Sequence, residues 1–135
     1  MQHRITPSYI NRLAANQIFV FGSNLACRHG SGAALMANRF GASRNRCHGL
    51  DGSVYGIPTK DERLEVLPID RIRTYIGNFI SDASNYPNMI FLVTRIGCGL
   101  AGYSDEQIAP LFVDAIDVEN IFLPEEFWKV LMKRQ

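Results

Sequence analysis

The sequence predicts an α/β fold, a three-layer α/β/α sandwich with a mainly parallel sheet. Short apolar runs alternate with helix-forming segments along most of the chain. These runs lack the polar alternation of a half-exposed strand, which is typical of parallel strands buried on both faces. The length of 135 residues predicts a single domain, 1–135, and we find no repeat, linker or low-complexity segment.

The first half of the chain contains two predicted helices and two predicted strands. Thr6-Pro7 is a helix-start signal, and the apolar residues after it recur at helical spacing. Pro58 is expected to stop the second strand. The predicted elements are a helix over 7–15, a strand over 17–21 (QIFVF), a helix over 33–40, a surface loop over 41–53 and a strand over 54–57.

The second half begins with the most clearly amphipathic segment, where isoleucines and Phe79 recur every three or four residues. Ser104 and Gln107 have the spacing of a capping box that opens a helix, and Pro110 should kink or divide that helix. The predicted elements are a helix over 68–83, a strand over 91–93, a helix over 104–116, a strand over 120–123 and a helix over 124–132.

Charge, hydropathy and cysteine content limit the class of protein. The net charge of +1 argues against a strong nonspecific nucleic-acid binder, so a nucleic-acid partner has no support from charge. We see neither a signal peptide nor about 18 consecutive apolar residues, which predicts a cytoplasmic protein with no membrane partner. Three cysteines without a C-x-x-C motif fit a reducing compartment better than a disulfide framework.

Standard cofactor and metal motifs do not fit. The dinucleotide pattern G-x-G-x-x-G fails at Leu35, and no G-K-[ST] of a P-loop is present. Cys27, His29, Cys47 and His48 match no standard metal-site spacing. We therefore expect no metal and no cofactor.

Three predicted strand exits carry the residues that suit ligand binding. Glycine-rich segments follow two strands, at 22–32 and 97–103, and Thr59 and Lys60 follow a third. In parallel sheets, ligands bind outside the carboxyl ends of the strands, where these three segments should meet. Glycines allow backbone N–H groups to approach a ligand, and a following helix start favours a phosphate. The alternative is that the glycines serve only tight turns.

Individual side chains of these segments allow more than one interpretation. Lys60 could attack a sugar anomeric carbon as a neutral amine, bind phosphate as a cation, or be an ordinary solvated lysine. Its neighbours Asp61 and Glu62 favour the charged form. His29 could hydrogen-bond a phosphate or ribose, or be an exposed loop residue. Four arginines could form a basic rim that binds nucleic acid, or could simply be solvated surface residues: Arg28, Arg39, Arg44 and Arg46.

Taken together, three motifs resemble the macro domain, the compact α/β/α module that binds ADP-ribose. They are HGSGAAL (29–35) with Phe40-Gly41, VYGIPTK (54–60) and RIGCGL (95–100). The match is closest to the lysine-dependent branch, whose glycohydrolases act on ADP-ribosylated protein acids and DNA bases. Over roughly 18–123 the chain also looks like a small uncharacterised family of phages and bacteria, with FGSNL (21–25), IPTK (57–60) and IGCGLAGY (96–103).

This resemblance implies an ADP-ribosyl glycohydrolase that acts on a modified protein or nucleic acid, with Lys60 as the catalytic residue. The chain differs from this branch at Ala101, where some members have an acidic residue. Asp105 is close in sequence, but we expect it to interact favourably with the dipole at the start of the following helix. The alternatives are a non-catalytic reader of ADP-ribose or a related nucleotide, and a phage accessory protein that uses another surface. The implied ligand-binding residues are Gly22, Ser23, Asn24, His29, Gly30, Ser31, Gly32, Ala33, Thr59, Ile96, Gly97, Cys98, Gly99, Leu100, Ala101, Gly102 and Tyr103.

Overall fold

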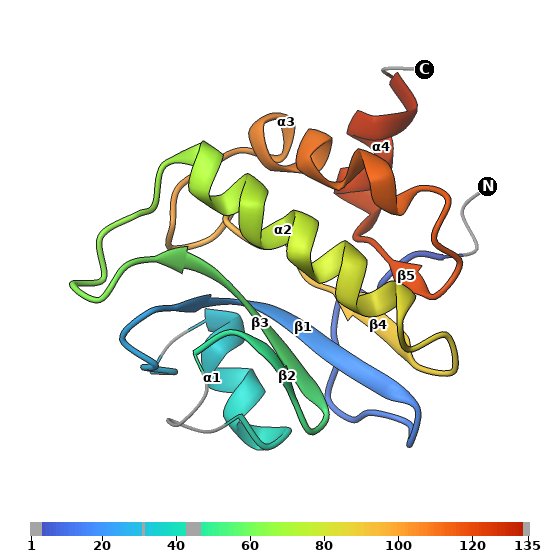
Figure 1. Ribbon diagram of the computed structural model, residues 1–135, viewed down its shortest axis with the longest axis horizontal. Helices are drawn as coiled ribbons and strands as arrows, with labels where there is room; N and C mark the ends of the chain where they lie inside the picture. Colours follow the sequence, from blue (N-terminus) through green and yellow to red (C-terminus); the bar gives the residue numbers. More distant parts are fainter. Residues whose placement is uncertain (1–3, 31, 43–46, 134–135) are drawn as a thin grey trace.

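The computed structural model describes residues 4–30, 32–42 and 47–133, which form a five-stranded sheet with helices on both faces (Figure 1). The strand order is β2-β3-β1-β4-β5, and only β2 runs antiparallel to its neighbour. The strands are β1 (Gln17–Asn24), β2 (Gly49–Asp51), β3 (Val54–Lys60), β4 (Ile90–Val93) and β5 (Ile121–Phe122). The predicted α/β fold with a mainly parallel sheet is confirmed.

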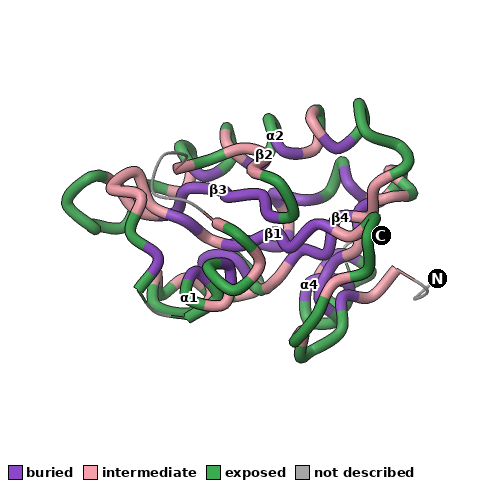
Figure 2. The backbone as a smooth tube through the Cα atoms, turned by 90° about the horizontal axis from the view of Figure 1, so that it is seen from below, coloured by how far each residue is buried: buried purple, intermediate pink, exposed green. Residues whose placement is uncertain are grey.

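Strand β1 lies at the centre of the sheet and separates two core clusters. Ile18 and Val20 belong to the larger cluster, whereas Phe19 and Phe21 belong to the smaller one on the opposite face. All four residues are buried, and most residues of the neighbouring strands β3 and β4 are buried as well (Figure 2). The QIFVF run is apolar throughout because both of its faces lie in the core.

The helices divide between these two clusters. Ala34 and Ala37 of α1 pack in the smaller cluster, whereas α2, η1 and α4 supply buried residues to the larger one. In α2, Ile72, Ile76 and Phe79 are fully buried, as their spacing predicts. The helices are α1 (Gly32–Arg39), α2 (Ile69–Ser84), α3 (Asp105–Ile108), the 3₁₀ helix η1 (Ala109–Ala115) and α4 (Glu125–Lys133).

The helix predicted over 104–116 is divided, as Pro110 suggested. Helix α3 begins at the predicted capping box, in which the Ser104 hydroxyl accepts from the Gln107 amide at 3.2 Å. The Gln107 side chain accepts in return from the Ser104 amide at 2.9 Å. After Ile108 the chain tightens into η1, with Pro110 in its first turn.

The helix predicted over 7–15 is wrong, because these residues form an irregular segment. Ile10 and Leu13 nevertheless pack against the smaller core cluster, while Tyr9 is exposed. A nine-residue helix is marginal by itself, because nucleation is unfavourable and only packing repays it. Here the two apolar side chains reach the core without helical structure.

Two predictions around β3 are also wrong. The expected loop over 41–53, of which 43–46 lie outside the described residues, contains the short strand β2, paired with β3 across a turn with Gly52 at φ 63°. Strand β3 does not end at Pro58 but continues to Lys60. Because β2 pairs with β3 only as far as Gly56, Pro58 lies on an edge, where proline is tolerated.

The expectation of unpaired cysteines is wrong as well. A disulfide joins Cys27, after β1, to Cys47, before β2, with their Cα atoms 4.6 Å apart. The two cysteines lie 20 positions apart in sequence, so only the path of the chain brings them together. Cys98 is the remaining free cysteine. In the part of the chain that the structure describes, no helix is long and apolar enough to cross a membrane.

Candidate functional site

The sheet contains a topological switch point between β1 and β4. These strands are parallel neighbours, yet the chain leaves β1 toward α1 on one face and leaves β4 toward α3 on the other. Adjacent connections that diverge in this way open a crevice at the carboxyl ends of the strands. The fold therefore provides a binding position where three glycine- or lysine-containing segments were expected to meet.

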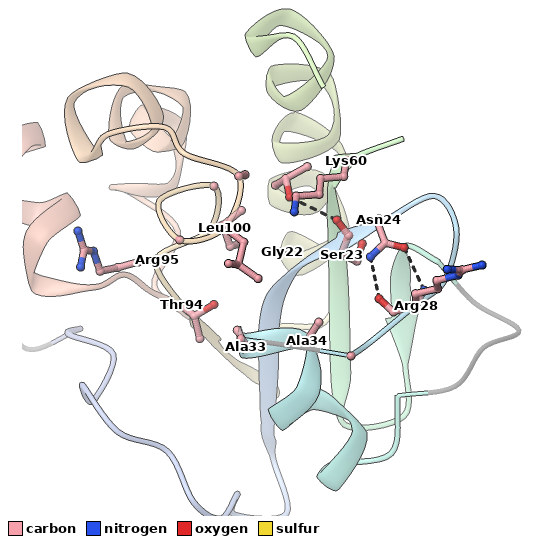
Figure 3. A pocket seen from close by; sticks show the side chains of 17 residues that line it. Gly22, Ser23, Asn24, Arg28, Ala33, Ala34, Lys60, Thr94, Arg95 and Leu100 are labelled. Atoms are coloured by element: carbon pink, nitrogen blue, oxygen red, sulfur yellow. Dashed lines mark hydrogen bonds between the residues drawn. The ribbon is translucent and has the colours of Figure 1, made fainter. Parts of the chain in front are cut away.

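A pocket of about 400 Å³ occupies this position (Figure 3). It is formed by the ends of β1 and β3, the segment that follows β4, and the first turn of α1. The lining residues are Gly22, Ser23, Asn24, Arg28, Gly30, Gly32, Ala33, Ala34, Thr59, Lys60, Thr94, Arg95, Ile96, Gly97, Gly99, Leu100 and Ala101.

Lys60 supplies the positive charge that faces the pocket. Arg28 and Arg95 also belong to the lining, but their side chains extend away from it (Figure 3), and the described lining residues include no carboxylate. Arg95 is neutralised by Asp105, with Nη2 to Oδ2 at 3.0 Å, and this hydrogen bond raises the pKa of Arg95. Among the described residues, the salt bridges include neither Arg28 nor Lys60. Figure 3 shows Lys60 extending from the end of β3 toward the loop that carries Leu100.

Helix α1 adds a further positive contribution. Its first residues, Gly32, Ala33 and Ala34, all line the pocket. The first N–H groups of a helix have no partner within the helix and carry the positive end of its dipole. Small side chains leave these groups accessible, so the arrangement suits a phosphate or diphosphate.

Two glycines and one leucine determine the shape of the pocket. A Cβ atom added to Gly22 would lie 3.5 Å from Thr59 Oγ1 and 3.7 Å from Ile96 Cγ2, so the floor is narrow at the end of β1. A Cβ atom added to Gly32 would lie 3.9 Å from Leu100 Cδ1. Leu100, which is 68% exposed, therefore reaches across to the start of α1 and offers an apolar cover for a ligand.

Comparison with known proteins agrees on the fold. No protein-family model matches the chain, and no curated protein matches it. Among solved structures it is similar to a macrodomain protein from Streptomyces coelicolor, with a TM-score of 0.55 and 16% identity over 84% of this chain and 88% of that chain. The fold is macrodomain-like.

A second solved structure is similar to this macrodomain-like chain to the same degree. It is a protein of unknown function from Bacteroides thetaiotaomicron, with a TM-score of 0.55 and 13% identity over 84% of this chain and 88% of that chain. At such low sequence identity, structural similarity indicates the fold but not the activity. The glycohydrolase branch and the phage relationship stay predictions.

Most of the residues that the resemblance implied lie around the pocket of this macrodomain-like fold, but some do not. Tyr103 instead donates from its hydroxyl to the Leu67 carbonyl at 2.6 Å, and its amide donates to the Gly97 carbonyl at 2.8 Å, which closes the glycine loop. Cys98 and Gly102 do not line the pocket either, and Ser31 lies outside the described residues.

His29 also lies away from the pocket lining. It is 7% exposed, so neither a ligand contact nor an exposed loop position describes it. Its ring meets the edge of Phe21 with centroids 5.4 Å apart, and its carbonyl accepts from the Asn38 side chain at 2.6 Å. These contacts anchor the loop before α1 to the smaller core cluster.

The implied ligand-binding set left out four lining residues, Arg28, Ala34, Thr94 and Arg95, although Arg28 was considered for a basic rim. Arg28 and Ala34 adjoin residues of that set, Arg95 begins a quoted motif and Thr94 precedes it, so position along the chain was the available signal. The Thr94 hydroxyl donates to the Val20 carbonyl at 2.8 Å and thereby ties the start of the glycine loop to β1.

The side chains at the end of β1 mainly hold the pocket wall in place. Asn24 Oδ1 accepts from the Arg28 amide at 3.0 Å, and Asn24 Nδ2 donates to the Arg28 carbonyl at 2.7 Å (Figure 3). Ser23 Oγ donates to the Cys47 carbonyl at 2.6 Å. With both groups engaged in this way, Lys60 is the polar side chain best placed to meet a ligand, whereas the Arg28 side chain extends away from the pocket (Figure 3).

The thiol of Cys98 is expected to be unreactive at neutral pH. Burial, with a further contribution from Asp105, raises the pKa of Cys98 to about 12. Because only the thiolate reacts, alkylation by iodoacetamide at pH 8 should be about a thousandfold slower than for an ordinary cysteine and should accelerate as the pH rises toward 12. The protein unfolded in urea is the control, and equal rates in the folded and unfolded protein would contradict the shift.

Proposed function

We propose that the pocket binds ADP-ribose and that the protein is an ADP-ribosyl glycohydrolase, which releases ADP-ribose from a modified protein or nucleic acid. The observation that carries the proposal is the position of Lys60. This lysine lies in the same pocket as the glycine loop and the start of α1, with no ion-pair partner among the described residues.

The parts of the pocket suit different parts of ADP-ribose. The glycine loop after β4 and the first turn of α1 together suit the diphosphate, because they offer backbone N–H groups and the positive end of a helix dipole. The glycine at position 22 allows a ribose to lie close to the end of β1, within reach of Lys60. The ligand-binding role of all these residues is part of the proposal.

Lys60 can serve the reaction in two ways. As a neutral amine, its nitrogen bonds to the anomeric carbon while the bond to the modified group breaks, and the amine proton passes through water to the leaving group. Water then cleaves the new carbon–nitrogen bond, which frees ADP-ribose and regenerates the lysine. As a cation, Lys60 instead orients the ribose while water attacks directly.

A second candidate function is a reader that binds ADP-ribose without cleaving it. The absence of any carboxylate from the lining favours it, since Ala101 stands where an acid could assist and Asp105 is paired with Arg95. A reader would bind ADP-ribose as tightly as the enzyme does but release nothing from a modified substrate. Turnover therefore separates the two functions, and affinity does not.

Calorimetric titration with ADP-ribose tests the binding that both functions share. We expect a Kd in the micromolar range, about −8 kcal/mol, with AMP at least about tenfold weaker because it lacks the second phosphate and the distal ribose. Competition by AMP is the control for a site that recognises only the nucleoside end. No heat and no thermal stabilisation at millimolar ADP-ribose would remove both functions.

A further inference from the structure

The disulfide between Cys27 and Cys47 lies directly beside the pocket. Cys27 precedes Arg28, which lines the pocket, and the Cys47 carbonyl accepts the hydrogen bond from Ser23 Oγ, another lining residue. The chain between the two cysteines contains the whole of α1, whose first turn forms one wall of the pocket. The disulfide therefore joins the two ends of a segment that carries one wall of the pocket.

The backbone at Cys27 supports a role beyond packing. Cys27 has a φ of 58°, in the left-handed region that favours glycine, and Leu64 is the one other such non-glycine residue that the structure describes. An unfavourable conformation persists when its surroundings hold it, and such positions cluster at clamps and switches. Here Cys27 is held by the disulfide and by the hydrogen bond from its amide to the Asn24 carbonyl at 3.1 Å.

The disulfide is open to exchange with a small thiol. Cys27 and Cys47 are each partly exposed. A thiolate attacks one sulfur and forms a mixed disulfide, and a second thiol then releases the reductant as its own disulfide. The products are two protein thiols and one oxidised reductant. Cys98 does not compete readily as an internal nucleophile, because burial raises its pKa.

We propose that Cys27 and Cys47 form a reversible redox tether that controls the affinity of the pocket. In the oxidised form the tether holds residues 24–30 and the start of α1 in their binding conformation. Thiol reductants release Cys27 from its left-handed conformation, which loosens the turn that leads to the pocket-lining residues at the start of α1. The ligand must then order this segment when it binds, which weakens affinity. The proposal rests on the proposed function for the ligand, ADP-ribose.

The test compares protein oxidised with oxidised glutathione and protein reduced with dithiothreitol. Thiol titration in denaturant should find one thiol in the oxidised form and three in the reduced form, in line with the three cysteines of the sequence. Calorimetry should find ADP-ribose bound about tenfold more weakly by the reduced form, as expected when a few freed residues must be ordered. Amide hydrogen exchange over residues 24–30 and 32–34 should be faster in that form.

A matched variant separates the tether from other effects of reductant. Cys27→Ser/Cys47→Ser has no disulfide and, like the reduced protein, carries a side chain at the positive φ of position 27; circular dichroism checks that it folds. Its affinity should match that of the reduced wild type and should not respond to dithiothreitol. Three thiols after oxidation, or equal affinity and exchange in both wild-type forms, would overturn the proposal. If neither form binds ADP-ribose while exchange still responds to reduction, the proposed ligand is wrong and the conformational tether stands.

Discussion

Replacing Lys60 with alanine is expected to slow ADP-ribose release by at least about 100-fold and to leave the affinity for ADP-ribose within about tenfold. The expectation follows from the structure of the pocket, where Lys60 is half-buried and no carboxylate is present to take over its role. In the proposed binding mode, backbone groups and the start of α1 hold the diphosphate, so we expect binding to change little. Single-turnover release from an ADP-ribosylated substrate, beside calorimetry, measures the two quantities.

Two further lysine variants sharpen this prediction. Lys129→Ala, on the exposed face of α4, removes the same charge away from the pocket and should leave release unchanged. Lys60→Arg keeps the positive charge but cannot act as an amine nucleophile, so it should retain release only if Lys60 orients the ribose as a cation. Unchanged release by Lys60→Ala would contradict a catalytic role, and a wild type that binds but never releases would establish the reader.

The parts of the fold that follow from local pattern could be predicted from the sequence. The run over 17–21 indicated a strand buried on both faces, and β1 has that environment. The spacing of Ile72, Ile76 and Phe79 predicted α2, and the Ser104 capping box predicted the start of α3. In each case the signal is a periodicity or a cap, which depends only on neighbouring residues.

The wrong predictions involve tertiary structure. Ile10 and Leu13 have helical spacing, but the core accepts them from an irregular segment. Strand β2 has three residues and exists because β3 lies beside it. The pairing of Cys27 with Cys47 depends on the path of the chain around α1, and cysteine spacing does not reveal that path.

For the candidate site, topology was predictable and side-chain direction was not. The position of the pocket was predictable because the carboxyl ends of parallel strands lie at one edge of the sheet, which places the three segments side by side. This topology could not show that Asn24 turns toward the Arg28 backbone or that Tyr103 turns toward Leu67. Loop residues take these directions from contacts made elsewhere in the fold, so the sequence indicated the position of the pocket better than its contacts.

Gly97 in the loop after β4 shows how strongly one such position is constrained, and Gly97→Ala is expected to lower the free energy of unfolding by about 2–4 kcal/mol. Gly97 has a φ of 77°, which disfavours any side chain. An added Cβ would also lie 2.9 Å from Cδ1 of Ile108, a fully buried residue that has little room to move. Strain and overpacking therefore add, and urea unfolding with an unchanged m-value measures their sum.

The matched control for this substitution is Gly99→Ala, two residues further along the same loop. A Cβ at Gly99 would meet no atom within 4 Å, and its φ is not positive, so the stability should stay within about 0.5 kcal/mol of the wild type. Both glycines line the pocket, so either substitution could also affect the proposed binding of ADP-ribose, which is measured in a separate titration. Equal destabilisation by the two variants would show that neither the conformation of Gly97 nor its contact with Ile108 sets the cost. A loss confined to Gly97 would establish that the loop conformation is held by the core beneath it, independently of what the pocket binds.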